Sequence, residues 1–242
     1  MIEFLPLILA VFSVALLYAS VGHGGASGYL AVMALFAVAP ESLRPTALAL
    51  NVLVSTIGTV AFYRAGHFRG HLFWPLALSS IPFAYLGGSL VLPDAAFRVL
   101  LGAALVVASL RLILPAAAVE QTRRPGGPVR LGCGAAMGLV SGLIGVGGGI
   151  FLTPLAILLR WAPAKSAAAI SAPFIWVNSV AGLIGLRPGS AEFHPALPWM
   201  ALAVLTAGVF GALWGSGRAD SRQLRGALAL VLLLASGKLL AT

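Results

Sequence analysis

The sequence predicts an all-α integral membrane protein made of two inverted repeats. The first observation is composition, because 60% of its 242 residues are hydrophobic and only 9% are charged. A soluble domain carries roughly a quarter charged residues. The second is a row of apolar segments separated by short polar ones. The third is a glycine-rich interruption that occurs twice, 123 positions apart. Together they exclude an ordinary soluble domain.

Ten apolar segments define the predicted helices. They fall at 4–21, 29–39, 45–63, 71–92, 96–114, 129–144, 150–161, 166–186, 195–215 and 222–240. Because a full crossing needs about 20 residues, the segments at 29–39 and 150–161 are too short and are predicted to be half-helices. Each half of the chain therefore contains a glycine-broken helical hairpin plus three transmembrane helices. This gives eight full spans, or ten segments when the half-helices are counted.

An internal duplication relates the two halves. At an offset of 123 residues, Gly22, Gly24 and Gly25 align with Gly145, Gly147 and Gly148, and Ala39-Pro40 aligns with Ala162-Pro163. Such self-similarity indicates a repeated structural unit. We expect a first transmembrane repeat at 1–114, a cytoplasmic linker at 115–128 and a second transmembrane repeat at 129–242.

Charge predicts the orientation of the repeats. If the linker is cytoplasmic and every segment crosses, only Arg44, Arg98, Arg187 and Lys238 lie on the opposite side, and the other eleven of the 15 basic residues are cytoplasmic. This positive-inside bias makes the halves inverted and both termini periplasmic. It also explains the net charge of +9 without nucleic acid. A positive field would in addition favour an anionic substrate.

The two glycine turns are the predicted substrate site. Successive main-chain N–H groups in such a turn form a concavity suited to anions, and the start of a helix strengthens it. Two broken helices at matching places in two halves are typical of a transporter site at the midplane. The alternative is that the glycines only allow close helix packing, which is the reading we give to Gly134, Gly138 and Gly142.

Polar side chains near the turns complete the candidate site. The full set of predicted substrate-binding residues is Gly22, His23, Gly24, Gly25, Ser27, Asn51, Ser55, Gly145, Gly147, Gly148, Gly149, Thr153 and Asn178. Alternatives remain for the side chains. Ser and Thr in membranes often bond to their own helix, and Asn can join helices instead of lining a cavity. His23 could be a packed core histidine.

Several functions are excluded by what the sequence lacks. All six carboxylates fall at segment ends or in loops, which argues against a cation carrier. There is no Walker A motif, and the His23–Ser27 string has no accompanying G-x-S-x-G, so no enzyme activity is expected. One Cys and four scattered His predict neither a metal site nor a cofactor.

These motifs together resemble a known family. A G-x-G-G turn opens a short helix once per half, followed by PTALALNVLVSTIGTVAFYRAGHF at 45–68 and SAPFIWVNSVAGLIG at 171–185. Over nearly the whole chain this resembles the sulfite exporter TauE/SafE family of membrane permeases. The resemblance implies a bacterial inner-membrane permease for small sulfur-containing anions such as sulfite or organosulfonates. It places the glycine motifs of the family on the two turns, with Ala26 where the second turn has Gly149.

Two other functions remain open at this point. One is a non-transporting membrane subunit or assembly factor, in which the glycines serve packing alone. The other is a transporter of a neutral small solute. The expected partners are the lipid bilayer, a small anionic substrate and, as an option, further copies of the chain in a homo-oligomer. The substrate, the direction of transport and the coupling ion are not determined by the sequence.

Overall fold

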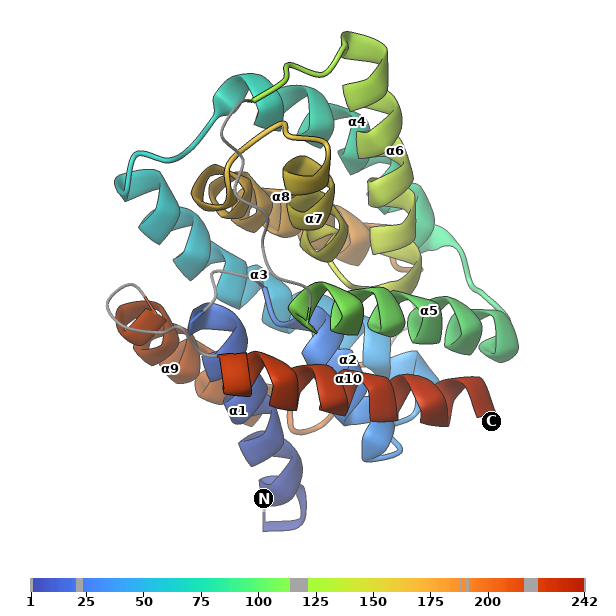
Figure 1. Cartoon of the computed structure of the whole chain (residues 1–242). Coiled ribbons are helices and arrows are strands. Elements are labelled where there is room, and N and C mark those ends of the chain that lie inside the picture. Colours follow the sequence, from blue (N-terminus) through green and yellow to red (C-terminus); the bar gives the residue numbers. More distant parts are fainter. Residues whose placement is uncertain are drawn as a thin grey trace.

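The computed structural model describes residues 2–20, 24–113, 122–187, 189, 192–215 and 222–241. Within these ranges all regular elements are helical (Figure 1). They are a short 3₁₀ helix η1 (Ile2–Phe4), then α1 (Leu5–Ser20), α2 (Ala26–Leu35), α3 (Pro40–Arg64), α4 (Gly70–Ser89), α5 (Asp94–Ile113), α6 (Gly127–Ile144), α7 (Gly149–Leu158), α8 (Ala164–Gly185), α9 (Leu197–Gly215) and α10 (Arg222–Ala241). Half of the predicted linker, residues 115–121, lies outside the described residues.

The ten predicted segments correspond in order to α1–α10, so the all-helical class is confirmed. The predicted half-helices are α2 and α7, each of 10 residues. Three helices in the described part, α3, α6 and α8, are long and apolar enough to cross a membrane. This agrees with a membrane protein. The number of full spans stays a prediction, because most of the other apolar helical stretches are shorter.

The 123-residue offset relates local backbone conformation as well as residue types. Helices α2 and α7 begin and end at positions that differ by 123. Left-handed residues also recur in pairs at this offset: Ala37 (φ 55°) with Arg160 (φ 58°), and Gly66 (φ 74°) with Gly189 (φ 79°). A left-handed conformation is uncommon outside glycine, so a matched pair of non-glycine residues is informative. The same turn therefore follows each of the two short helices.

Helix packing is reciprocal between the halves. If α1–α5 correspond to α6–α10, then the packing of α4 against α6 has its counterpart in α9 against α1, and α4 against α8 in α9 against α3. The pairs α3–α8 and α5–α10 are their own counterparts. Figure 1 shows α4, α6, α7 and α8 gathered in the upper part of the molecule and α1, α2, α5 and α10 in the lower part. One buried apolar cluster lies among the upper four helices, and a larger one joins the lower four to α3 and α9.

The glycine stripe of α6 is a packing surface, as the sequence predicts. A methyl group added at Gly134, Gly138 or Gly142 would collide with the main-chain carbonyl oxygens of Leu76, Ser80 and Ala84 in α4. Each glycine thus allows the two helix backbones to touch. The contact fixes α6 on α4 and so places the turn that follows α6.

Replacing Gly138 by Ala should destabilise the protein. The added methyl group has no space against the α4 backbone, and overpacking of this kind costs about 1–3 kcal/mol. We expect the midpoint of thermal unfolding in detergent to fall by several degrees. The matched control is Gly132→Ala on the same helix, where nothing lies within 4 Å and Ala favours the helix. Equal midpoints for the two variants would contradict close α4–α6 packing.

Candidate functional site at the two glycine turns

The second turn requires glycine for its backbone conformation. It joins α6 to α7 through Gly145 (φ 80°), Gly147 (φ 73°) and Gly148 (φ 80°), all left-handed. An L residue pays roughly 1–2 kcal/mol for each such conformation. The Gly145 N–H donates to the Ser141 carbonyl oxygen at 2.8 Å and closes α6. All residues from 145 to 149 are buried, so this helix interruption lies inside the protein.

The first turn differs from the second in its described part. Gly22 and His23, both predicted site residues, lie outside the described residues. Gly24 is half-buried, and Gly25 precedes α2 with φ −89°, which any residue can adopt. The sequence places equivalent glycines in the two turns, but only the second uses left-handed glycines among the residues described.

Both short helices begin earlier than the apolar pattern indicates. The sequence places their starts at about Tyr29 and Ile150, whereas α2 begins at Ala26 and α7 at Gly149. The first helical turn needs no apolar side chain, so hydrophobicity detects it late. As a result Ser27 lies on the first turn of α2 and Gly149 is the first residue of α7, and neither belongs to the turn itself.

The two turns meet at the same pair of side chains. A methyl group added at Gly24 would lie 2.9 Å from Ile175 Cδ1 and 3.5 Å from Asn51 Oδ1. One added at Gly147 would lie 2.7 Å from Asn51 Nδ2 and 2.8 Å from Ile175 Cγ2. Gly24 and Gly147 are equivalent at the 123-residue offset. Two breaks more than a hundred residues apart in sequence are thus brought together between α3 and α8.

Asn51 lies between the two turns. Its side chain is fully buried, and Nδ2 donates to Ser179 Oγ at a long 3.4 Å. Its Oδ1 atom has no hydrogen-bond partner among the described residues. A buried amide without its full set of partners costs about 1–3 kcal/mol, so it is poised for a further polar group.

Asn178 on α8 is a second buried amide whose oxygen lacks a hydrogen-bond partner among the described residues. It is fully buried, Nδ2 donates to the Phe174 carbonyl oxygen at 2.9 Å, and Oδ1 has no partner in the described structure. A methyl group added at Gly148 would lie 3.6 Å from Asn178 Nδ2. The Ser141 hydroxyl, just before the second turn, is also buried without a partner among these residues. Buried polar atoms without hydrogen-bond partners among the described residues therefore lie around the second turn.

The three predicted hydroxyl residues already have partners. Ser27 Oγ pairs with Tyr18 OH at 2.6 Å, Ser55 Oγ donates to the Asn51 carbonyl oxygen at 2.6 Å, and Thr153 Oγ1 pairs with Ser171 Oγ at 2.8 Å. Ser55 thus follows the alternative of bonding to its own helix. Ser27 joins α2 to α1 and Thr153 joins α7 to α8, and direct contact of the three hydroxyls with substrate stays a prediction.

Sequence reasoning missed two residues at this meeting point. Ile175 contacts Gly24, Gly147 and Gly149, and Ser179 accepts the Asn51 hydrogen bond while fully buried. An isoleucine in an apolar segment carries no signal of its own. Ser179 directly follows Asn178, so the sequence does show a second polar residue at this place in an apolar segment. It does not show that Ser179 pairs with Asn51 on α3.

The arrangement places main-chain donors beside two buried amides whose Oδ1 atoms have no partner among the described residues. The first turn of α7 leaves N–H groups without intrahelical acceptors, as every helix start does. Those groups point toward the second glycine turn and favour negative charge. The fold and this site define a multi-pass membrane protein with paired broken helices.

The comparison with known proteins identifies the family. Residues 7–239 match the family described as sulfite exporter TauE/SafE, and the chain belongs to this family. The match covers both glycine turns and nearly the whole chain, and it confirms the resemblance read from the motifs.

Relatives agree with this assignment. A probable membrane transporter protein of Sinorhizobium fredii is 38% identical over 243 residues, covering 98% of each chain. A probable membrane transporter protein of Methanocaldococcus jannaschii is 40% identical over 60 residues, or 25% of this chain and 22% of the relative. No solved structure matches this chain. The family and the full-length relative establish a membrane transporter as the functional class.

Proposed function

We propose that this protein transports small sulfur-containing anions, such as sulfite or organosulfonates, by alternating access at the two glycine turns. The observation that carries the proposal is the meeting of Gly24 and Gly147 at Asn51 and Ile175. Paired helix breaks at one place are where transporters with repeats bind substrate. The name of the family supports a sulfur oxyanion as the cargo.

The proposed architecture is a pair of inverted repeats, 1–114 and 129–242, joined by the linker at 115–128. It is supported by the left-handed pairs Ala37/Arg160 and Gly66/Gly189 and by the reciprocal packing of α4–α6 and α9–α1. The positive-inside bias supports a cytoplasmic linker and periplasmic termini in a bacterial inner membrane.

In the proposed mechanism the anion accepts hydrogen bonds from main-chain N–H groups at the two helix starts. Asn51 Nδ2 and Asn178 Nδ2 lie beside the turns and each donates one N–H to a protein acceptor, so the second N–H of each would donate to the anion, whereas their unpaired Oδ1 atoms can only accept. The Ile175 side chain fills the space between Gly24 and Gly149. Admission of an anion therefore requires α8 to shift relative to α2 and α7, first on one side of the membrane and then on the other.

Flux measurements in proteoliposomes test this proposal. We expect uptake of sulfite, thiosulfate or an organosulfonate to respond to an imposed membrane potential, because each carries net charge. A matched neutral solute, such as dimethyl sulfone, should not be carried. Empty liposomes and protein heated before reconstitution serve as controls.

Each alternative function gives a different outcome. Flux of the neutral solute that is insensitive to potential would favour a neutral cargo. Absence of flux for every anion, together with no shift in thermal unfolding on adding any of them, would favour a non-transporting subunit and overturn the proposal.

A further inference from the structure

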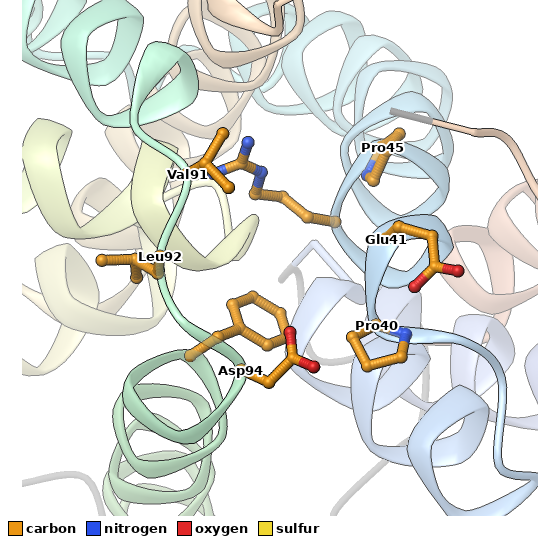
Figure 2. Close-up of a pocket in the computed structure, with 8 residues that line it drawn as sticks. Pro40, Glu41, Pro45, Val91, Leu92 and Asp94 are labelled. Atoms are coloured by element: carbon orange, nitrogen blue, oxygen red, sulfur yellow. The ribbon is translucent and has the colours of Figure 1, made fainter. Parts of the chain in front are cut away.

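A separate pocket lies where the start of α3 faces the loop between α4 and α5. Its volume is about 120 Å³, and Figure 2 shows Pro40, Glu41 and Pro45 on one side and Val91, Leu92 and Asp94 on the other. Arg44 and Phe97 complete the lining. The pocket thus combines one cation and two carboxylates with apolar walls, and none of its residues belongs to the predicted substrate site.

Arg44 holds the ends of two helices through main-chain oxygens. Nη1 donates to the carbonyl oxygens of Leu90 (3.0 Å), Leu143 (3.3 Å) and Gly87 (3.4 Å), and Nη2 donates to that of Gly88 (2.9 Å). These carbonyls lie at the carboxyl ends of α4 and α6, where a positive charge is favourable. Arg44 therefore locks α4 against α6.

The guanidinium keeps donors for a further ligand. Among the described residues, no acceptor bonds to Arg44 Nε, and only one bonds to Nη2. Nε–H and one Nη2–H have no acceptor among the described residues, and Nε and Nη2 share one edge of the guanidinium. Such an edge binds an oxyanion through two parallel hydrogen bonds. Among the described residues Arg44 makes no ion pair, although it is half-buried.

The Arg44 pocket adjoins the second glycine turn. A methyl group added at Gly145 would lie 3.0 Å from Arg44 Cγ and 3.3 Å from its main-chain oxygen. Gly145 is the first residue of the turn, so the backbone of α3 at Arg44 packs directly on it. A ligand that draws the guanidinium away from α4 and α6 would loosen the helix end that supports the turn.

Two carboxylates moderate the positive charge in the pocket. Glu41 and Asp94 are exposed and lie in the first turns of α3 and α5, respectively, where a negative charge is favourable for the helix. Both repel an anion. They should make binding weak, which suits a site that an ion must leave again.

We propose that the Arg44 pocket is a low-affinity oxyanion site outside the glycine turns, through which the anion reaches them. The ligand is a small oxyanion bearing at least two oxygens on one centre, held by Nε–H and Nη2–H of Arg44. The passage from this site to the turns rests on the transport function proposed above, whereas binding in the pocket does not.

The carboxylates provide the sharpest test, because they can be neutralised without touching the hydrogen bonds of Arg44. Glu41→Gln and Asp94→Asn should each lower the KM for sulfite flux by about threefold, and kcat should change little. Calorimetric titration of the detergent-purified variants with sulfite should show the same gain in affinity. Arg44→Lys should raise KM and Kd about tenfold, since Lys keeps the charge but loses the two-donor edge.

The matched control is Glu192→Gln, which removes the same charge in the loop before α9, outside the pocket, and should leave KM and Kd unchanged. If Arg44→Lys fails to fold, the two carboxylate variants still decide the question. Unchanged affinity in both Glu41→Gln and Asp94→Asn would overturn the pocket as an anion site, even if wild-type flux is robust. If the wild type carries no oxyanion, transport fails, but altered calorimetric binding in the same variants would still support the pocket.

Discussion

Gly147→Ala should reduce anion flux by about a hundredfold or more, the loss that accompanies roughly 2.7 kcal/mol of transition-state destabilisation. Two effects add at this residue. Its φ of 73° costs an alanine roughly 1–2 kcal/mol. The added methyl group would also lie 2.7 Å from Asn51 Nδ2 and 2.8 Å from Ile175, so it must displace the side chains on which the two turns converge. The measurement is initial sulfite flux in proteoliposomes, normalised to inserted protein.

The matched control for this variant is Gly66→Ala. Gly66 has nearly the same backbone conformation, with φ 74°, but nothing lies within 4 Å of an added methyl group. It therefore reproduces the backbone strain without the contact with Asn51. We expect Gly66→Ala to lower thermal stability and to keep most of the flux per folded protein. Equal loss of flux in the two variants would mean that strain alone explains the effect.

The sequence was sufficient to predict the order of the helices, whereas the duplication that it indicates stays a prediction. Apolar length separated the two half-helices from the longer segments, and the 123-residue offset found positions whose backbone is the same, such as Gly66 and Gly189. Both signals are local or periodic, so a single chain displays them. The inverted orientation rests on charge alone and stays a prediction.

The contacts across the two halves could not be predicted in this way. Asn51 stood out as a polar residue in an apolar helix, but nothing in the sequence paired it with Ser179 or placed it beside Gly147. Arg44 carried only a topological meaning, whereas the structure shows it bonded to the ends of α4 and α6. Such contacts depend on how helices distant in sequence cross, which hydropathy does not encode.

Asn51→Asp should abolish anion flux with little change in fold. The two side chains have nearly the same shape, and Ser179 Oγ, which now accepts the hydrogen bond from Nδ2, can donate to a carboxylate instead. The substitution places a negative charge beside Gly24 and Gly147. Within a few ångströms of a bound anion in a buried site, that repulsion is worth several kcal/mol, so we expect a loss of about a hundredfold or more.

The control that separates charge from lost hydrogen bonding is Asn51→Leu, which is of similar size and uncharged. It should lower flux by about tenfold, the effect of losing hydrogen bonds worth about 1.4 kcal/mol. The readout specific to a binding role is pH dependence, measured with an organosulfonate whose charge is constant. Flux of Asn51→Asp, relative to wild type, should recover as the pH falls and the carboxylate takes up a proton. If Asn51 only fastens α3 to α8, Leu should be at least as damaging as Asp, and acid should restore nothing; with that outcome Asn51 would be a structural residue, and the anion would have to bind elsewhere.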